Sequence, residues 1–248
     1  MKKIKLSFLG MLLLGAVACT KNTSNVPAMN SNVSNAEAAD MVAGSVSLNS
    51  NGVANVATDV SVSANVFVGA HLTCGTTKAD SISRKSTTGS SVTYSYNLKY
   101  NYTLKCDANN NPDSLSSSLI YSGSFNGPNL SSTNSGSSIF TVGELSSSSA
   151  DFVINGEYKR SGSFQSKIDT TNAGNNNVDI VVNGLTVKKI GQTIVSGNAS
   201  ISVSGNVPKK GSFSYTGTLV FNADNTATLT LNGVVYTINM VTGQRMKK

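Results

Sequence analysis

The chain has 248 residues, of which only 12% are charged and none is tryptophan, and its formal net charge is +7. Serine, threonine and asparagine together supply about a third of the sequence. This composition is unlike that of a cytosolic enzyme or a disordered polyelectrolyte. The basic residues are scattered and form no stripe with aromatic residues, which argues against nucleic acid as a partner.

The first 18 residues have the organisation of a secretory signal. Three lysines within the first five residues precede an apolar run from Leu6 to Val17, which is too short to span a bilayer. The run ends in Ala16-Val17-Ala18-Cys19, which resembles the lipobox of bacterial lipoproteins, although a lipobox usually has leucine in the place of Ala16. The resemblance implies cleavage before Cys19 and attachment of lipid to Cys19. The resemblance also implies the outer membrane of a bacterial cell envelope, because Thr20 stands where an aspartate would imply retention at the inner membrane.

The chain is therefore expected to have three parts. Residues 1–18 are a signal peptide, residues 19–35 are a lipidated cysteine with a flexible polar tether, and residues 36–248 are a single β-rich extracytoplasmic domain. Removal of the signal lowers the 19 basic residues to 16 against 12 acidic ones, which leaves a net charge of +4. The expected membrane contact is thus through the lipid on Cys19.

The beginning of the domain predicts one short helix. Residues 34–44 offer Ser34 or Asn35 as a cap, an acidic first turn and Gly44 as a stop. The run from Ala54 to Cys74 then places apolar residues at alternate positions and predicts a strand, although its first half also fits a helix.

The clearest strand pattern runs from Val92 to Cys106, where every even position is apolar or aromatic and every odd position is polar. At about 3.3 Å per residue this strand is roughly 50 Å long, so the sheet is long or strongly curved. Its even face carries four tyrosines, Tyr94, Tyr96, Tyr100 and Tyr102. Such a row is typical of a core, and its alternative role is to bind a sugar or an apolar ligand.

The C-terminal third predicts a meander of antiparallel strands around the hairpin turn Asn232-Gly233. The same dipeptide at Asn155-Gly156 and Asn183-Gly184 suggests a repeated hairpin. Further strands are expected near residues 115–122, 138–145, 163–169 and 192–204.

Two cysteines remain after lipidation, and in an oxidising compartment this even count favours a disulfide between Cys74 and Cys106. Their numbers sum to 180, so a hairpin centred on residues 89–91 would place them opposite each other. In the competing interpretation, Cys74 ends the preceding strand and a crossing loop brings it to Cys106.

The sequence offers little for catalysis. The only histidine is His71, and no nucleophile elbow, phosphate-binding loop or dinucleotide fingerprint is present, so no cofactor is predicted. Asp151 and Glu157 are candidates for the paired carboxylates of a glycan hydrolase. The segment from residue 107 to 113 places oxygen-bearing side chains at alternate positions, as calcium loops do, but it lacks the usual glycine and distal glutamate. Its candidate ligands are Asp107, Asn109, Asn111 and Asp113.

Taken together, these patterns predict an all-β, mostly antiparallel domain that forms a β-sandwich or a strongly curved sheet. The leading functional hypothesis is a non-enzymatic envelope protein that binds or scaffolds, with a glycan or another envelope protein as partner. The alternative is a carrier that encloses a lipid or other apolar ligand in a groove lined by the tyrosine row, and a glycan hydrolase is the third hypothesis.

Overall fold

A computed structural model describes residues 33–146 and 148–248. The predicted signal peptide, most of the tether and the lipidation site Cys19 lie outside the described residues. The described chain forms one sheet of eleven strands, in which each strand pairs antiparallel with the next strand in sequence. The prediction of an all-β antiparallel meander is therefore confirmed, and the sheet is strongly curved and does not form a sandwich.

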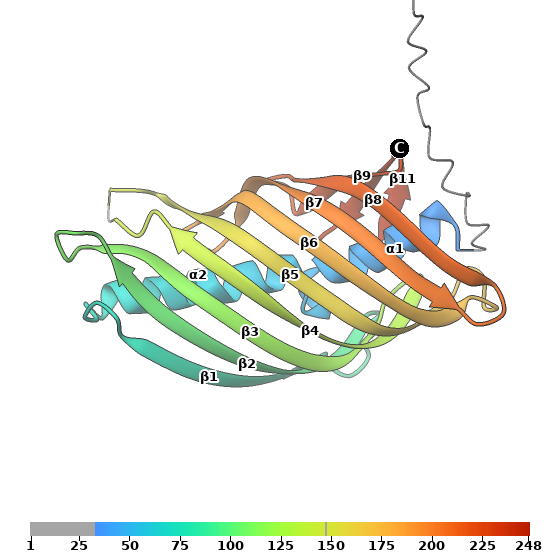
Figure 1. The fold of residues 1–248 in the computed structure, drawn as a ribbon, viewed down its shortest axis with the longest axis horizontal. Coiled ribbons are helices and arrows are strands. Elements are labelled where there is room, and N and C mark those ends of the chain that lie inside the picture. The colour runs from blue at the N-terminus through green and yellow to red at the C-terminus, as the bar shows by residue number, and fades with distance from the viewer. Residues whose placement is uncertain (1–32, 147) are drawn as a thin grey trace, which may run out of the picture.

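Two helices and one short 3-10 turn precede the sheet: α1 (Asn35–Val46), η1 (Leu48–Ser50) and α2 (Val53–Gly69). The strands are β1 (Thr77–Lys85), β2 (Thr93–Cys106), β3 (Pro112–Asn126), β4 (Leu130–Gly143), β5 (Asp151–Ser166), β6 (Ala173–Lys188), β7 (Ile194–Val207), β8 (Gly211–Phe221), β9 (Thr226–Leu231), β10 (Val234–Asn239) and β11 (Arg245–Lys247). Figure 1 shows the sheet curving around the two helices. The inner sheet face and the helices share the hydrophobic core, while the outer face meets solvent.

Helix α1 confirms the predicted N-terminal helix. Ser34 is its cap, and the Ser34 hydroxyl accepts a hydrogen bond from the backbone N–H of Glu37, whose carboxylate accepts in return from the backbone N–H of Ser34. This reciprocal capping box satisfies two donors that a helix start leaves open. The helix continues past Gly44 because that glycine is buried against the ring of Phe125, where its lack of a side chain allows close packing.

The strand interpretation of residues 54–74 is wrong and the helical alternative for its first half is confirmed, because most of this segment is helix α2. Its buried residues recur at three- and four-residue intervals, as in Val53, Val56, Val60, Ala64 and Phe67. Valine and alanine at alternate positions produced a strand pattern as well, and the small side chains let the helix approach the sheet closely. Tertiary packing thus overrides the β propensity of valine here.

The repeated hairpin suggested by the Asn-Gly pairs is also wrong at two of the three sites. Asn232-Gly233 does turn the chain between β9 and β10. By contrast, Asn183-Gly184 lies inside β6, where the pairing register with both neighbouring strands shifts and Gly184 has a φ of +64°. Asn155 lies opposite on β5, and its side-chain oxygen accepts from the Gly184 N–H at 2.8 Å. The positive φ that favours a hairpin turn serves a β-bulge at this place.

Cys74 and Cys106 form the predicted disulfide. Strands β1 and β2 pair so that each set of partners sums to 180, from Thr77 with Thr103 to Lys85 with Ser95. The hairpin interpretation is therefore confirmed, and the crossing-loop alternative is not. The disulfide joins the end of the segment that follows α2 to the end of β2.

The chain contains three arginines, and all three attach the helices to the sheet. At one edge of the sheet, Arg84 of β1 binds both carboxylate oxygens of Asp59 in α2, at 2.7 and 3.0 Å. At the other edge, Arg245 of β11 binds Asp40 of α1 at 2.8 and 3.1 Å. Paired charges of this kind fix the position of each edge strand on its helix.

The third arginine, Arg160 of β5, is buried at the centre and has no carboxylate among its hydrogen-bond partners. Its guanidinium donates to the backbone oxygen of Gly44 at 2.6 Å, to the backbone oxygen of Ser50 and to the Tyr158 hydroxyl at 3.1 Å. It also lies over the rings of three tyrosines, at 5.8–6.0 Å from their centres: Tyr96, Tyr121 and Tyr158. Arg160 therefore ties the end of α1 and the η1 turn to the middle of the sheet.

The inner sheet face pairs glycines with aromatic rings on adjacent strands, which lets the sheet curve tightly. Gly123 lies opposite Tyr96, Gly136 opposite Tyr121, and Gly205 opposite Phe213. A Cβ atom added at Gly123 would lie 2.1 Å from the backbone oxygen of Ser95 and 2.3 Å from a Tyr96 ring carbon. A larger residue at these positions would clash with the neighbouring strand, so glycine is required for steric reasons and not because the chain turns there.

Replacing Gly123 with alanine is expected to lower the free energy of unfolding by about 1–3 kcal/mol, because the backbone oxygen of Ser95 must move. Gly69→Ala is the matched control, since a Cβ at Gly69 meets no atom within 4 Å. Urea unfolding followed by circular dichroism measures both variants. Equal midpoints for the two variants would contradict the steric role of Gly123.

Candidate binding face

The outer face of the sheet carries two adjacent cross-strand rows made only of serine, threonine and asparagine. Each row crosses seven neighbouring strands, from β2 to β8. The first row comprises Asn97, Ser122, Ser135, Ser161, Asn177, Ser204 and Ser214. The second comprises Ser95, Ser124, Thr133, Ser163, Asn175, Asn206 and Ser212. We call these two rows the outer polar face.

Shallow clefts run along the outer polar face. Two of them, of about 470 and 680 Å³, share Ser95, Ser124 and Thr133. A third, of about 390 Å³, meets the second at Ser161 and extends to β7. The clefts therefore follow a path across β2 to β7. Serine, threonine and asparagine residues of the two rows line much of this path, and the other lining residues include Tyr94, Phe125 and Phe164 in the first cleft and Lys159 and Asp179 in the third.

The charged side chains beside the third cleft form a cluster in which one lysine lies near two carboxylates. Lys159 forms an ion pair with Glu157 at 2.8 Å and lies 3.9 Å from Asp179 on the next strand. Partial burial and the neighbouring charge of Glu157 raise the pKa of Asp179 above its ordinary value. Lys159 and Asp179 line the third cleft, and the two rows themselves contain no charged side chain.

The aromatic residues and arginines, which often dominate binding at protein interfaces, do not belong to the two rows. Every tyrosine and phenylalanine between residues 33 and 248 is buried or packs against the core, and the three arginines bind the helices. The outer polar face thus offers many neutral donors and acceptors with little side-chain entropy to lose. Such a face can bind a neutral, hydrogen-bonding partner over a large area.

No family model, curated protein or solved structure matches the chain. The assignment of function therefore depends on the chemistry of the residues themselves.

The tyrosine row lies on the inner face, beneath the helices. Tyr96, Tyr100 and Tyr102 are buried and Tyr94 is half-buried. The Tyr100 hydroxyl donates to Asp59 of α2 at 2.7 Å, and the Tyr102 ring packs against Phe67 of the same helix. In this structure the row contributes to the core, and Tyr94 is also among the residues that line the first outer cleft.

The four calcium candidates belong to the turn between β2 and β3. The Asp107 carboxylate accepts from the backbone N–H groups of Asn109 and Asn111, both at 2.8 Å, and from the Asn111 side chain at 3.2 Å. The hydrogen bonds from Asn111 and Asn109 lower the pKa of Asp107. Asp107 therefore organises the turn, and Asp113 follows it at the start of β3.

The remaining candidates are His71, Asp151 and Glu157, and they do not form one site. His71 lines an open cleft of about 640 Å³ with Asp107, Asp113 and Glu144. Within residues 33–146 and 148–248, no group of three or more His, Cys, Asp or Glu side chains is arranged to hold a metal ion. Asp151 pairs with Lys188 at 3.0 Å, and Glu157 pairs with Lys159, so these two carboxylates have separate partners.

Among the helices of the described chain, none combines the length and the apolar character needed to cross a membrane.

Proposed function

We propose that the chain is a lipid-anchored, non-enzymatic protein of the bacterial cell envelope, held at the outer membrane through Cys19, and that its outer polar face binds a neutral polysaccharide. The observation that carries this proposal is the pair of uncharged Ser, Thr and Asn rows with the clefts along them. The lipobox-like sequence before Cys19 supports the anchor.

Polysaccharide suits this face better than protein does. Protein interfaces depend on a few aromatic and arginine anchors, and the outer polar face has none of these side chains. A neutral polysaccharide presents hydroxyl groups that both donate and accept, as serine, threonine and asparagine do. Adjacent strands repeat the side chains at about 4.8 Å, so a chain lying across the strands meets successive polar groups.

The proposal favours binding over hydrolysis. A glycosidase needs two carboxylates that flank one bond, with the pKa of one raised by its surroundings. The rows contain no carboxylate, and the carboxylates beside them are engaged with lysines. The face can therefore hold a sugar chain, but it supplies no acid and base pair for cleaving it.

The double variant Ser135→Glu with Ser161→Glu tests the proposal. These two residues pair across β4 and β5 in the first row, and both are exposed. Two carboxylates there would repel each other and displace the sugar hydroxyls, so we expect binding to neutral envelope polysaccharide to weaken by about tenfold or more. Sedimentation with insoluble polysaccharide, and titration with soluble fragments, measure the effect.

The matched control is Ser200→Glu with Thr218→Glu, an exposed cross-strand pair on β7 and β8 outside the two rows. It adds the same charge to the same sheet face and is expected to leave affinity within about twofold. A wild-type protein that binds only charged polysaccharides or only a protein partner would refute the proposal. Equal losses in the two double variants would refute the role of the rows.

A further inference from the structure

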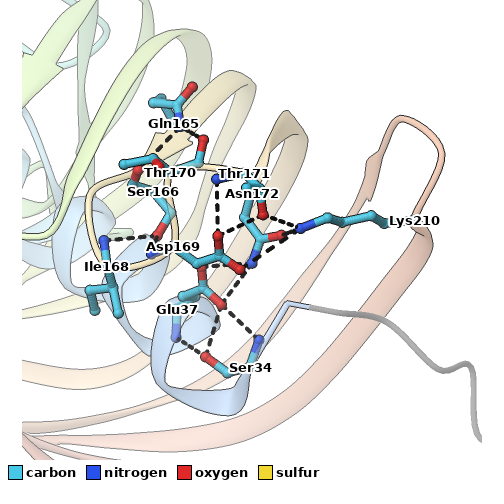
Figure 2. Close-up of polar contacts among 10 residues, drawn as sticks. All are labelled: Ser34, Glu37, Gln165, Ser166, Ile168, Asp169, Thr170, Thr171, Asn172 and Lys210. Carbon is cyan, nitrogen blue, oxygen red and sulfur yellow. Dashed lines mark hydrogen bonds and ion pairs between the residues drawn. The ribbon is translucent and has the colours of Figure 1, made fainter.

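Three polar residues from distant parts of the chain meet where α1 begins. Glu37 lies in the first turn of α1, Asn172 ends the loop between β5 and β6, and Lys210 belongs to the loop between β7 and β8. The Lys210 Nζ donates to the Asn172 side-chain oxygen at 2.6 Å. The Asn172 side-chain nitrogen donates to the two Glu37 carboxylate oxygens at 2.9 and 3.1 Å. Figure 2 shows the three side chains converging.

The surroundings hold this arrangement in place. Asn172 is fully buried and Glu37 is 4% exposed, while the Lys210 side chain is 24% exposed. Glu37 also accepts from the backbone N–H and the hydroxyl of Ser34, at 3.0 and 2.9 Å. A primary amine therefore contacts the oxygen of a side-chain amide, and a fixed carboxylate contacts the nitrogen of the same amide.

We propose that Lys210 and Asn172 become joined by an intramolecular amide bond, with Glu37 transferring the proton that the reaction requires. The chemistry is an exchange of one amide for another. It consumes the Lys210 amine and the Asn172 side-chain amide, and it releases one ammonia. No oxidant, reductant or further reactant is needed.

The steps balance with groups that are present. Asp169, 3.8 Å from the Lys210 Nζ, takes a proton from the Lys210 ammonium. The free lone pair of Lys210 attacks the Asn172 Cγ, a C–N bond forms, and the carbonyl electrons move to Oδ1. Glu37 takes the excess proton from the attacking nitrogen and delivers it to Nδ2. The bond from Cγ to Nδ2 then breaks, the carbonyl reforms, and ammonia leaves. The ammonia takes the proton held by Asp169 and becomes ammonium, so Asp169 returns to its carboxylate form.

The electrostatics suit Glu37 for this role. Burial alone would raise the pKa of Glu37, but the hydrogen bonds from Asn172 and Ser34 bring it below its ordinary value. The carboxylate is therefore ionised at neutral pH and able to accept a proton next to the leaving nitrogen. Holding amine and amide in contact replaces a bimolecular encounter, which accelerates such reactions by many orders of magnitude.

Peptide mapping of the full mature chain, purified from its own envelope, tests the bond directly. Trypsin cleaves after lysine and arginine, so an unlinked chain yields residues 168–188 and 211–245 as separate peptides. The amide bond blocks cleavage after Lys210 and yields one branched species that joins residues 168–188 to 210–245. Its mass is lower than the sum of its two parts by one ammonia, about 17 Da.

We expect the branched species in the wild type, and its complete loss in Lys210→Arg, which keeps the positive charge but removes the primary amine. Lys209→Arg is the matched control, since Lys209 is the exposed neighbour on the same loop and its replacement should leave the branched species unchanged. Glu37→Gln should slow the reaction by about 100-fold, which a time course at 37 °C records on chains whose near-ultraviolet circular dichroism matches the wild type.

A wild-type chain that yields only the two separate peptides overturns the proposal. Deamidation of Asn172 without branching, which adds about 1 Da, also overturns it. Full branching in folded Glu37→Gln overturns the role of Glu37 as the proton-transfer group.

Discussion

Replacing Arg160 with methionine is expected to lower the free energy of unfolding by about 3–5 kcal/mol. The substitution removes every hydrogen bond of the buried guanidinium but leaves its partners in place. The backbone oxygens of Gly44 and Ser50 then lack that donor in the core, and three tyrosine rings lose the cation beside them. Denaturant unfolding, followed by tyrosine fluorescence and circular dichroism, measures the loss.

The control for this variant is the adjacent residue. Lys159→Met removes a positive charge whose side chain is 53% exposed and whose partners are surface carboxylates. Its unfolding midpoint should stay close to that of the wild type. Arg160→Lys should also be strongly destabilising, because one ammonium cannot reproduce the fork that reaches both backbone oxygens. If Arg160→Met and Lys159→Met unfold at the same denaturant concentration, Arg160 does not hold the helices to the sheet.

The second large effect is expected at the disulfide. Replacing both Cys74 and Cys106 with serine should lower the free energy of unfolding by about 2–4 kcal/mol, because the bond closes a loop between residues 32 apart and restricts the unfolded chain. Equilibrium unfolding with and without a reductant measures the effect in the same protein.

Reductant should lower the unfolding midpoint of the wild type to that of the double serine variant, and it should leave the variant unchanged. This comparison separates the bond from the serine side chains. A wild-type midpoint that does not respond to reductant, after the thiols are shown to be free, would contradict the prediction.

The elements that could be predicted are those whose pattern has one structural explanation. Strict alternation over residues 92–106 specifies a half-buried strand, and β2 occupies Thr93–Cys106. Of the two interpretations of the cysteine pair, the hairpin predicts the register of β1 and β2 correctly, because a hairpin keeps the sum of the partner numbers constant. The capping residues Ser34 and Glu37 likewise marked the start of α1.

The errors arose where one pattern has two explanations. Valine and alanine in residues 53–69 satisfy both a period of two and a helical period, and only contact with the sheet selects the helix. Asn183-Gly184 satisfies a hairpin turn and a bulge equally, since both use a positive φ. Local sequence carries no signal that separates these outcomes.

The candidate sites were less accessible from the sequence than the fold. The alternate polar positions along the strands could be read from the sequence. The two rows of the outer polar face can be recognised only when the register of β2 to β8 is known. The group formed by Glu37, Asn172 and Lys210 was not predicted, because 135 residues separate the first two. The three arginines and their shared role could have been sought, since their rarity was evident from composition.

The contact between Arg245 and Asp40 links β11 to α1, the last and first elements of the described residues, across 205 residues. The strands pair in sequence order, so during synthesis the two helices are made first and each new strand can pair only with the strand before it. The buried carboxylate of Asp40 gains its ion-pair partner only when Arg245 of β11 is in place. A chain truncated before Arg245 keeps ten of the eleven described strands but lacks the cation beside Asp40, so the attachment of this sheet edge to α1 depends on Arg245.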